Sequence, residues 1–159
     1  MVQIGHGHES VRGTCAAMRM KVAFWLSRTP DSVAIARTTL DQIFKSFGVT
    51  ADCREEIALA VTEACSNAVR HASGAQVYEV AAESDDSQCV ITVNDDGPGL
   101  EHKPPGEMPP PDTPHGRGFA LMRMVVDRVQ LRRRTSGGLS VRLFKRLRWH
   151  EGAFGHRAP

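Results

Sequence analysis

The sequence predicts an α/β fold, a two-layer sandwich in which helices cover one face of a mixed, mainly antiparallel sheet. The hydrophobic pattern gives the order strand, helix, helix, hairpin, loop, helix, hairpin. Both hairpins have short connections, which imply antiparallel neighbours. A length of 159 residues, with 41% hydrophobic and 24% charged side chains, suits a single globular domain with a real core.

The first half of the chain predicts one strand and two helices. Residues 20–27 are rich in apolar side chains that favour a strand. Thr29-Pro30-Asp31 is a helix-start signal, and the apolar residues that follow recur with helical period as far as Gly48, which suits a C-terminal cap. A second helix is expected from about residue 51 to 72, with acidic residues in its first turn.

The second half predicts two hairpins on either side of a third helix. The expected elements are strands at 76–82 and 88–94, a helix at 117–128, and strands at 129–135 and 139–147. Prolines crowd residues 97–114, between the first hairpin and the third helix, and predict a mobile loop there.

The chain is expected to be a cytoplasmic protein with one folded domain. Residues 1–18 predict a flexible leader, 19–148 the domain, and 149–159 a tail. The N-terminus lacks the apolar core of a signal peptide, and no apolar run is long enough to span a membrane. Four cysteines without metal or redox spacing fit a reducing cytosol. A net charge of +2 gives no argument for binding nucleic acid.

Basic side chains gather towards the C-terminus. They are Arg132, Arg133, Arg134, Arg142, Lys145, Arg146 and Arg148. A solvated strand face explains such a pattern, and a surface for an acidic partner is the alternative.

The second expected helix carries a polar row beside its apolar row. At about 100° per residue, Glu63, Asn67 and Arg70 share one narrow stripe, with His71 beside it. An amide oxygen suits Mg²⁺ beside phosphates, a glutamate can accept a proton, and an arginine can donate to phosphate. The same spacing also occurs on a solvated helix face, so this stretch alone leaves both interpretations open.

A glycine-rich turn follows the strand expected at 88–94. Asp95 could accept a hydrogen bond from an exocyclic amine such as that of adenine, and Gly97 and Gly99 would let the backbone approach a flat ring. An ordinary Asp-Gly-Pro turn is the alternative interpretation.

A second glycine turn, Gly116-Arg117-Gly118, begins the helix expected at 117–128. Amides at a helix N-terminus bind phosphate, and glycines leave room for it. The turn is not a P-loop, because Gly-Lys-Ser/Thr is absent from the sequence, and it does not follow a first strand as a dinucleotide-binding turn would.

Taken together, these motifs resemble those of the GHKL ATPases, which share the Bergerat ATP-binding fold. The N box corresponds to Glu63-x-x-x-Asn67-x-x-x-His71, the G1 box to Asp95-x-Gly97-x-Gly99, and the G2 box to Gly116-x-Gly118-Phe119. The segment 136–143 is similar to the family's final hairpin. The resemblance runs from about residue 20 to 147 and is strongest to the anti-sigma-factor serine kinases of bacterial partner-switching systems.

The resemblance implies a role for each matching residue. Glu63 would be the general base and Asn67 the Mg²⁺ ligand. The other residues expected to bind ATP or ADP are Arg70, His71, Asp95, Gly97, Gly99, Gly116, Arg117, Gly118, Phe119 and Ser140. Residues 100–115 would form a lid, and Arg37 would lie on a surface for a partner protein or phosphate.

The implied activity is transfer of the ATP γ-phosphate to a serine of an anti-sigma-factor antagonist, with sequestration of a sigma factor when the antagonist is unavailable. The family implies a homodimer and gives no role to nucleic acid or membrane. The chain departs from the family pattern at Pro114, which is followed by His115 and stands where some members have an arginine two positions before the first G2 glycine. The lid is short and rich in proline, and Ser140 stands where threonine is common.

Three other interpretations remain open on the sequence. A non-catalytic module that binds ATP or ADP and regulates a partner would share the same motifs. A detached histidine-kinase fragment would need an upstream phosphoacceptor helix, which the sequence does not contain. A globular α/β domain with accidental motif matches would bind no nucleotide.

Overall fold

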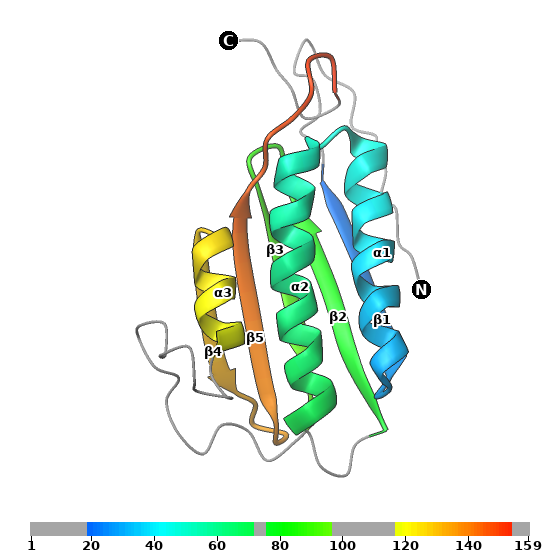
Figure 1. Ribbon diagram of the computed structural model, residues 1–159, viewed down its shortest axis with the longest axis vertical. Helices are drawn as coiled ribbons and strands as arrows, with labels where there is room; N and C mark the ends of the chain where they lie inside the picture. Colours follow the sequence, from blue (N-terminus) through cyan, green and yellow to red (C-terminus); the bar gives the residue numbers. More distant parts are fainter. Residues whose placement is uncertain (1–18, 72–75, 97–116, 154–159) are drawn as a thin grey trace, which may run out of the picture.

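Five strands form one sheet in the computed structural model, which describes residues 19–71, 76–96 and 117–153 (Figure 1). The strands are β1 (Met20–Ser27), β2 (Val77–Ser84), β3 (Gln88–Asn94), β4 (Arg128–Arg133) and β5 (Leu139–Arg146). Their order across the sheet is β1-β2-β3-β5-β4, and each of these four pairings is antiparallel. β5, the last strand in the chain, therefore lies inside the sheet.

Three helices cover one face of this sheet (Figure 1). They are α1 (Pro30–Phe47), α2 (Ala51–His71) and α3 (Arg117–Val125). α1 begins with a proline, whose fixed φ suits the first turn, and ends at Gly48. Gly48 has φ +88°, and its amide donates to the Lys45 carbonyl at 3.0 Å, closing the helix in the left-handed cap that glycine favours. The predicted two-layer α/β architecture is confirmed.

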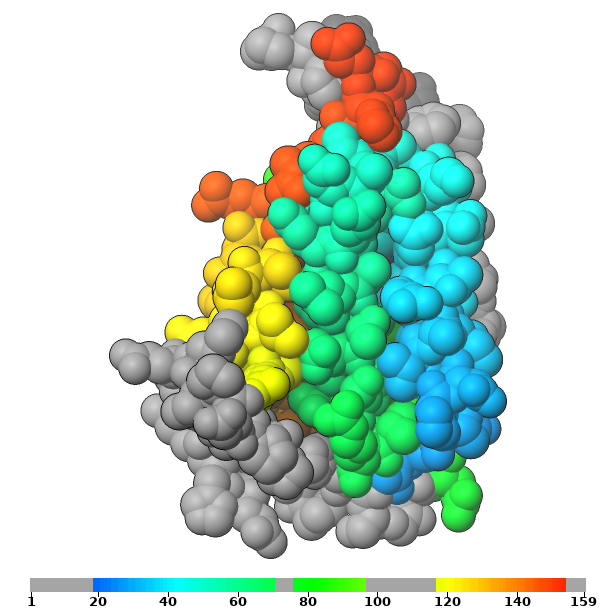
Figure 2. All heavy atoms as spheres, viewed as in Figure 1, coloured from blue at the N-terminus to red at the C-terminus, as the bar shows by residue number. Residues whose placement is uncertain are grey.

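The core lies between the helices and the inner face of the sheet. Strand residues alternate, so that Val80, Ile91 and Leu143 are buried against the helices. α2 runs through the middle of the helical layer, with α1 on one side and α3 on the other (Figure 2). Its inner face is built from small side chains, including Ala60 and Ala64, which are fully buried. Small residues allow the helix axis to lie close to the sheet.

The third helix is shorter than its hydrophobic period predicts. It ends at Val125, although the pattern predicts helix to residue 128. The Asp127 amide donates to the Phe144 carbonyl at 2.9 Å, and Arg128 is already paired with Phe144 in the sheet. The prediction of helix for these residues was wrong, because pairing with β5 replaces the last helical turn.

The packed part of the chain continues past residue 148. Val49 and Trp149 form an isolated β-bridge, the Trp149 indole donates to the Asp86 carbonyl at 2.9 Å, and the His150 amide donates to the Gly48 carbonyl at 2.9 Å. The first residues of the segment expected to be a loose tail thus contact the α1–α2 connection. Within the described ranges, none of the three helices combines the length and apolar character that a membrane span requires.

Candidate nucleotide-binding site

The polar row of α2 lies at the edge of the helical layer. Glu63 and Asn67 are half-buried, and Arg70 is exposed. Ala64 and Ala68, next to them in the sequence, are buried in the core. Among the described residues, neither Glu63 nor Asn67 has a hydrogen-bond or ion-pair partner. Two polar side chains therefore lie beside the core without a partner in the described ranges.

The N-terminal turn of α3 packs directly on Glu63. A Cβ atom added to Gly118 would lie 2.5 Å from Glu63 Oε2 and 3.4 Å from Cδ. Any side chain at this position would therefore displace the carboxylate. Gly118 lets the start of one helix approach the polar row of another, which places the free amides of a helix N-terminus next to Glu63.

Asp95 is buried immediately after β3, with 8% of its surface exposed. Its amide donates to the Leu139 carbonyl at 2.9 Å, and the Leu139 amide lies 3.4 Å from Asp95 Oδ1. Arg134 Nη1 donates to the Asp95 carbonyl at 3.1 Å and forms an ion pair with the neighbouring Asp96. Asp95 is thus contacted by Leu139, the first residue of β5, and by Arg134, the residue after β4.

The β4–β5 turn comes closest to Asp95 at Gly138. Gly138 has φ +87°, and a Cβ atom there would overlap the Asp95 carbonyl oxygen and the Asp96 backbone. Arg134 and Gly138 were not among the residues predicted for the site. The Gly-Gly pair in the turn was a usable signal for a close backbone approach. Nothing in the local sequence connects Arg134 with an aspartate 39 residues away.

The other predicted residues fall into two groups. Arg117 is exposed at the start of α3, and Phe119 is half-buried and packs against the core. Ser140 pairs with Asn94 of β3, and it alternates with Leu139 and Val141, which contact the core. This alternation places Ser140 on the open face of the sheet, away from the helices.

The remaining predicted residues lie outside the described part of the protein. They are Gly97, Gly99 and Gly116, together with the expected lid at 100–115. His71 is the last residue of α2, but its side chain is outside the description as well.

The end of α2 that carries the polar row is held from the β1–α1 connection. Arg28 Nη2 donates to the Val69 carbonyl at 2.9 Å, and Nε donates to the Ala68 carbonyl at 3.3 Å. These carbonyls belong to the last turns of the helix, where intrahelical partners run out. A cation at a helix C-terminus is also favoured by the helix dipole. Arg28 therefore stabilises the backbone on which Asn67 and Arg70 stand.

The sequence matches the profile of the histidine kinase-like ATPase domain over residues 26–145. The chain belongs to this family. It is 29% identical over 138 residues to the anti-sigma F factor of Pasteuria penetrans, covering 81% of this chain and 91% of that protein. It is 30% identical over 133 residues to the serine-protein kinase RsbW of Bacillus licheniformis, covering 74% and 80%.

A solved structure shares the fold of this ATPase domain. The RsbU and RsbW domains of Rv1364c from Mycobacterium tuberculosis superimpose with a TM-score of 0.62 at 21% identity. The match covers 80% of this chain and 32% of that longer one. The likeness confirms the predicted α/β architecture.

The polar row of the ATPase domain carries side-chain oxygens of the kind that Mg²⁺ prefers, including the amide oxygen of Asn67. Within the described ranges, no three His, Cys, Asp or Glu side chains converge as a protein-only metal centre. Mg²⁺ beside a nucleotide takes most of its ligands from phosphate and water, with one or two from protein. The half-buried Asn67 amide, one turn from Glu63, fits that need.

The C-terminal basic residues of the ATPase domain do not form one patch. Arg134 pairs with Asp96, and Lys145 is buried in an ion pair with Glu56. The Arg142 guanidinium lies 5.2 Å from the centre of the Phe144 ring on the open face of the sheet. The sequence predicts that these basic residues lie on a solvated strand face. Lys145 does not, because it is 8% exposed and lies in the core.

Proposed function

We propose that this ATPase domain is an ATP- and Mg²⁺-dependent protein serine kinase, whose substrate is an anti-sigma-factor antagonist. The observation that carries the proposal is the contact between Gly118 and Glu63. It brings a helix N-terminus, suited to phosphate, next to a carboxylate that has no partner among the described residues. A phosphate-binding turn beside an available base is what phosphoryl transfer to a hydroxyl requires.

In this proposal the two ends of ATP are bound by different elements. Asp95, whose backbone contacts Leu139 and Arg134, accepts a hydrogen bond from the exocyclic amine of adenine. Gly97 and Gly99 are assigned to the nucleotide pocket from the resemblance of their motif alone. At the other end, the residues assigned to the phosphates are Arg70, His71, Gly116, Arg117 and Gly118, with Phe119 supporting the turn. Ser140, on the open face of the sheet, is given no contact to the nucleotide.

Glu63 is the proposed general base. Its carboxylate accepts the proton of the substrate serine hydroxyl as that oxygen forms its bond to the γ-phosphorus, while the bond to the leaving ADP oxygen breaks. Mg²⁺, held on the protein by Asn67, would neutralise phosphate charge. Glu63 is half-buried, so it is shielded from bulk water and still reachable by a partner's side chain.

The proposed partners follow from the relatives. One relative is named an anti-sigma F factor and another a serine-protein kinase. We therefore propose a sigma factor and a phosphorylatable antagonist as alternative partners of a homodimer, with Arg37 on the partner surface. The proposed setting is the cytoplasm, and the proposed functional unit is residues 19–148.

Nucleotide binding is tested first, by calorimetric titration with MgATP and MgADP. Asp95→Asn should weaken binding about ten- to hundredfold, because a hydrogen bond to a charged acceptor contributes about 1.5–3 kcal/mol. Asp86→Asn is the matched control, since Asp86 lies in the β2–β3 turn outside the site. No binding of either nucleotide by the unaltered protein would overturn the proposal.

Phosphate transfer is tested with radiolabelled MgATP and a purified antagonist from the same genome, followed by phosphoserine analysis. Glu63→Gln should bind MgATP normally but transfer phosphate about 10²–10⁴-fold more slowly. Glu55→Gln, an exposed glutamate on the same helix, should behave like the unaltered protein. Tight binding of ATP without transfer to any antagonist would instead favour a non-catalytic regulatory module.

A further inference from the structure

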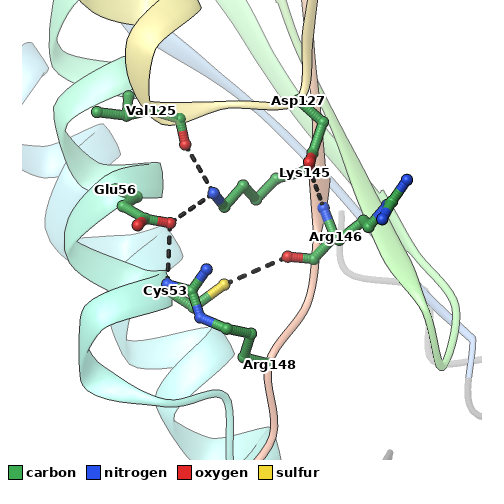
Figure 3. A network of polar contacts seen from close by, with 7 residues as sticks. All are labelled: Cys53, Glu56, Val125, Asp127, Lys145, Arg146 and Arg148. Atoms are coloured by element: carbon green, nitrogen blue, oxygen red, sulfur yellow. Dashed lines mark hydrogen bonds and ion pairs between the residues drawn. The ribbon is translucent and has the colours of Figure 1, made fainter.

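A buried ammonium group connects three elements at the end of α3 opposite the candidate site (Figure 3). Lys145 Nζ lies 2.5 Å from Glu56 Oε2 on α2 and donates to the Val125 carbonyl, the last of α3, at 2.7 Å. Arg148 Nη2 contacts the same carboxylate oxygen of Glu56 at 2.9 Å. β5 thus reaches through Lys145 to both helices that form the candidate site.

Lys145 occupies a position that the strand pattern reserves for an apolar residue. Leu143 and Leu147, its neighbours on the same face, are both buried in the core. Placing an ammonium here costs desolvation, which is offset because the group has a carboxylate and a helix-end carbonyl as partners. Although burial raises the pKa of Glu56, hydrogen bonds from Lys145 and Arg148 outweigh it and hold that pKa below its ordinary value. Glu56 is therefore ionised at neutral pH and remains a strong partner.

The two ends of α3 both rest on glutamates of α2. At the N-terminal end Gly118 lies against Glu63, and at the C-terminal end Val125 is joined to Glu56 through Lys145. Glu56 and Glu63 are seven residues apart, two turns of α2, and therefore share one side of the helix. Gly118 and Val125 are also seven residues apart. The two helices thus meet over the same axial length, with one glutamate at each end.

We propose that Lys145 and Glu56 are positioning residues for phosphate binding. By fixing the C-terminal end of α3, they hold its N-terminal turn, Arg117 and Gly118, at the distance from Glu63 that the phosphates require. The inference rests on the proposed function. α3 has only nine residues, so a release at one end moves the whole helix relative to α2.

A variant that lacks only the Lys145 ammonium tests whether its contacts position α3 or merely stabilise the fold. Lys145→Met keeps an unbranched side chain in the core and leaves Glu56 paired with Arg148. The matched control is Arg148→Gln, which also removes a cation from Glu56 but leaves the bond to Val125 intact. Glu56→Gln is a second variant, on a less buried position, that weakens the connection from the α2 side.

The measurement compares MgADP with adenosine, because α3 is assigned to the phosphates and Asp95 to the base. Lys145→Met should raise the dissociation constant for MgADP about tenfold, within the usual range of coupling between sites. The constant for adenosine should change less than about twofold, because the base is assigned to Asp95 and not to α3. Arg148→Gln should change neither constant, because it leaves Lys145 bonded to both Val125 and Glu56. Glu56→Gln should also raise the dissociation constant for MgADP and leave that for adenosine within about twofold.

Hydrogen exchange without nucleotide tests the mechanical part of the inference. The amides of α3 should exchange faster in Lys145→Met than in Arg148→Gln, because the anchored end opens more often. Equal exchange in the two variants would overturn the inference, as would equal weakening of MgADP and adenosine binding. Failure of the unaltered protein to bind MgADP would overturn the proposed function itself, whatever the exchange rates.

Discussion

At the residue scale, Gly118 lies in the first turn of α3, at a position where a Cβ atom would contact Glu63. The atom that a Cβ would meet is the tip of the flexible Glu63 side chain, 2.5 Å away. Gly118→Ala should therefore move the carboxylate without disrupting the backbone. Alanine also favours helix by about 0.5–1 kcal/mol over glycine, which offsets the strain.

We expect Gly118→Ala to change the free energy of unfolding by less than about 1 kcal/mol and to slow phosphate transfer at least about tenfold, since small displacements of a reacting group are costly. Urea unfolding and a transfer assay check the two parts. Transfer at the full rate would show that the position of the Glu63 carboxylate does not depend on Gly118. Ready unfolding would show that the added Cβ disturbs more than this side chain.

Gly137 and Gly138 form a matched pair in the β4–β5 turn. Both have positive φ, +92° and +87°, but a Cβ on Gly137 would meet open space, whereas one on Gly138 would overlap the backbone at Asp95. Gly137→Ala should cost about 1–2 kcal/mol of unfolding free energy, the usual cost of the left-handed conformation. Gly138→Ala should cost clearly more and weaken adenosine binding. Urea titration of both variants measures the difference, and equal losses would contradict the proposed support of Asp95.

The sequence alone singles out Asp95 and Glu63 as candidate site residues, but not the residues that contact them. Their residue types and spacing carry a chemical meaning that needs no long-range information. The residues that contact Asp95 and Glu63 cannot be read from such local motifs. Arg134, for example, reaches Asp95 only once β4 and β5 have paired. Similarly, Gly118 was expected to make room for phosphate, while its packing on Glu63 depends on how α3 crosses α2.

At the scale of elements, the last turns of α2 depend on a residue from outside the helix. Arg28→Ala removes the donors to the Ala68 and Val69 carbonyls. We expect a loss of about 1–3 kcal/mol in unfolding free energy, the usual range for bonds from a charged donor. Amides of residues 68–71 should exchange faster with solvent, while Arg146→Ala, an exposed arginine on β5, should leave them unchanged. Unchanged exchange in Arg28→Ala would contradict the role of this cap.

Element boundaries were predictable where local chemistry decides them. Gly48 ends α1 through its own conformation, and the helix stops where the sequence indicates. α3 is different, because the helical hydrophobic period continues to residue 128, whereas the backbone turns to β5 at Asp127, whose amide donates to the Phe144 carbonyl. A local hydrophobic pattern carries no information on pairing with a strand later in the chain. The C-terminal end of α3 was therefore predicted three residues too late.

At the scale of the whole molecule, three weak acids of the described core have a raised pKa and are protonated in the folded state at neutral pH. Burial raises the pKa of Cys65, Tyr78 and Cys89, each to about 12. The folded protein therefore binds these protons more tightly than the unfolded chain, where the ordinary values are 9 for cysteine and 10 for tyrosine. Their contribution to stability is complete below about pH 9 and is lost as the pH rises towards 12.

We expect the urea midpoint to fall steadily from pH 9 to pH 11, with little change between pH 7 and 8.5. Tyr78→Phe removes one of the three protons, so its midpoint should fall less steeply over the same range. The variant leaves Ser32 bonded to the Thr29 carbonyl at 2.7 Å. A midpoint that stays level to pH 11 would show that these groups ionise freely in the native protein.

The place of β5 between β3 and β4 also has a consequence for how the protein is made. The ribosome releases β5 last of the five strands, yet both of its neighbours depend on it, and Asp95 takes its backbone partner from its first residue. A nascent or truncated chain that stops before residue 139 exposes an unpaired edge on β3, the kind of edge that invites aggregation. The proposed nucleotide site is likewise incomplete until β5 has been synthesised, so nucleotide binding would mark a chain in which β5 has paired with β3.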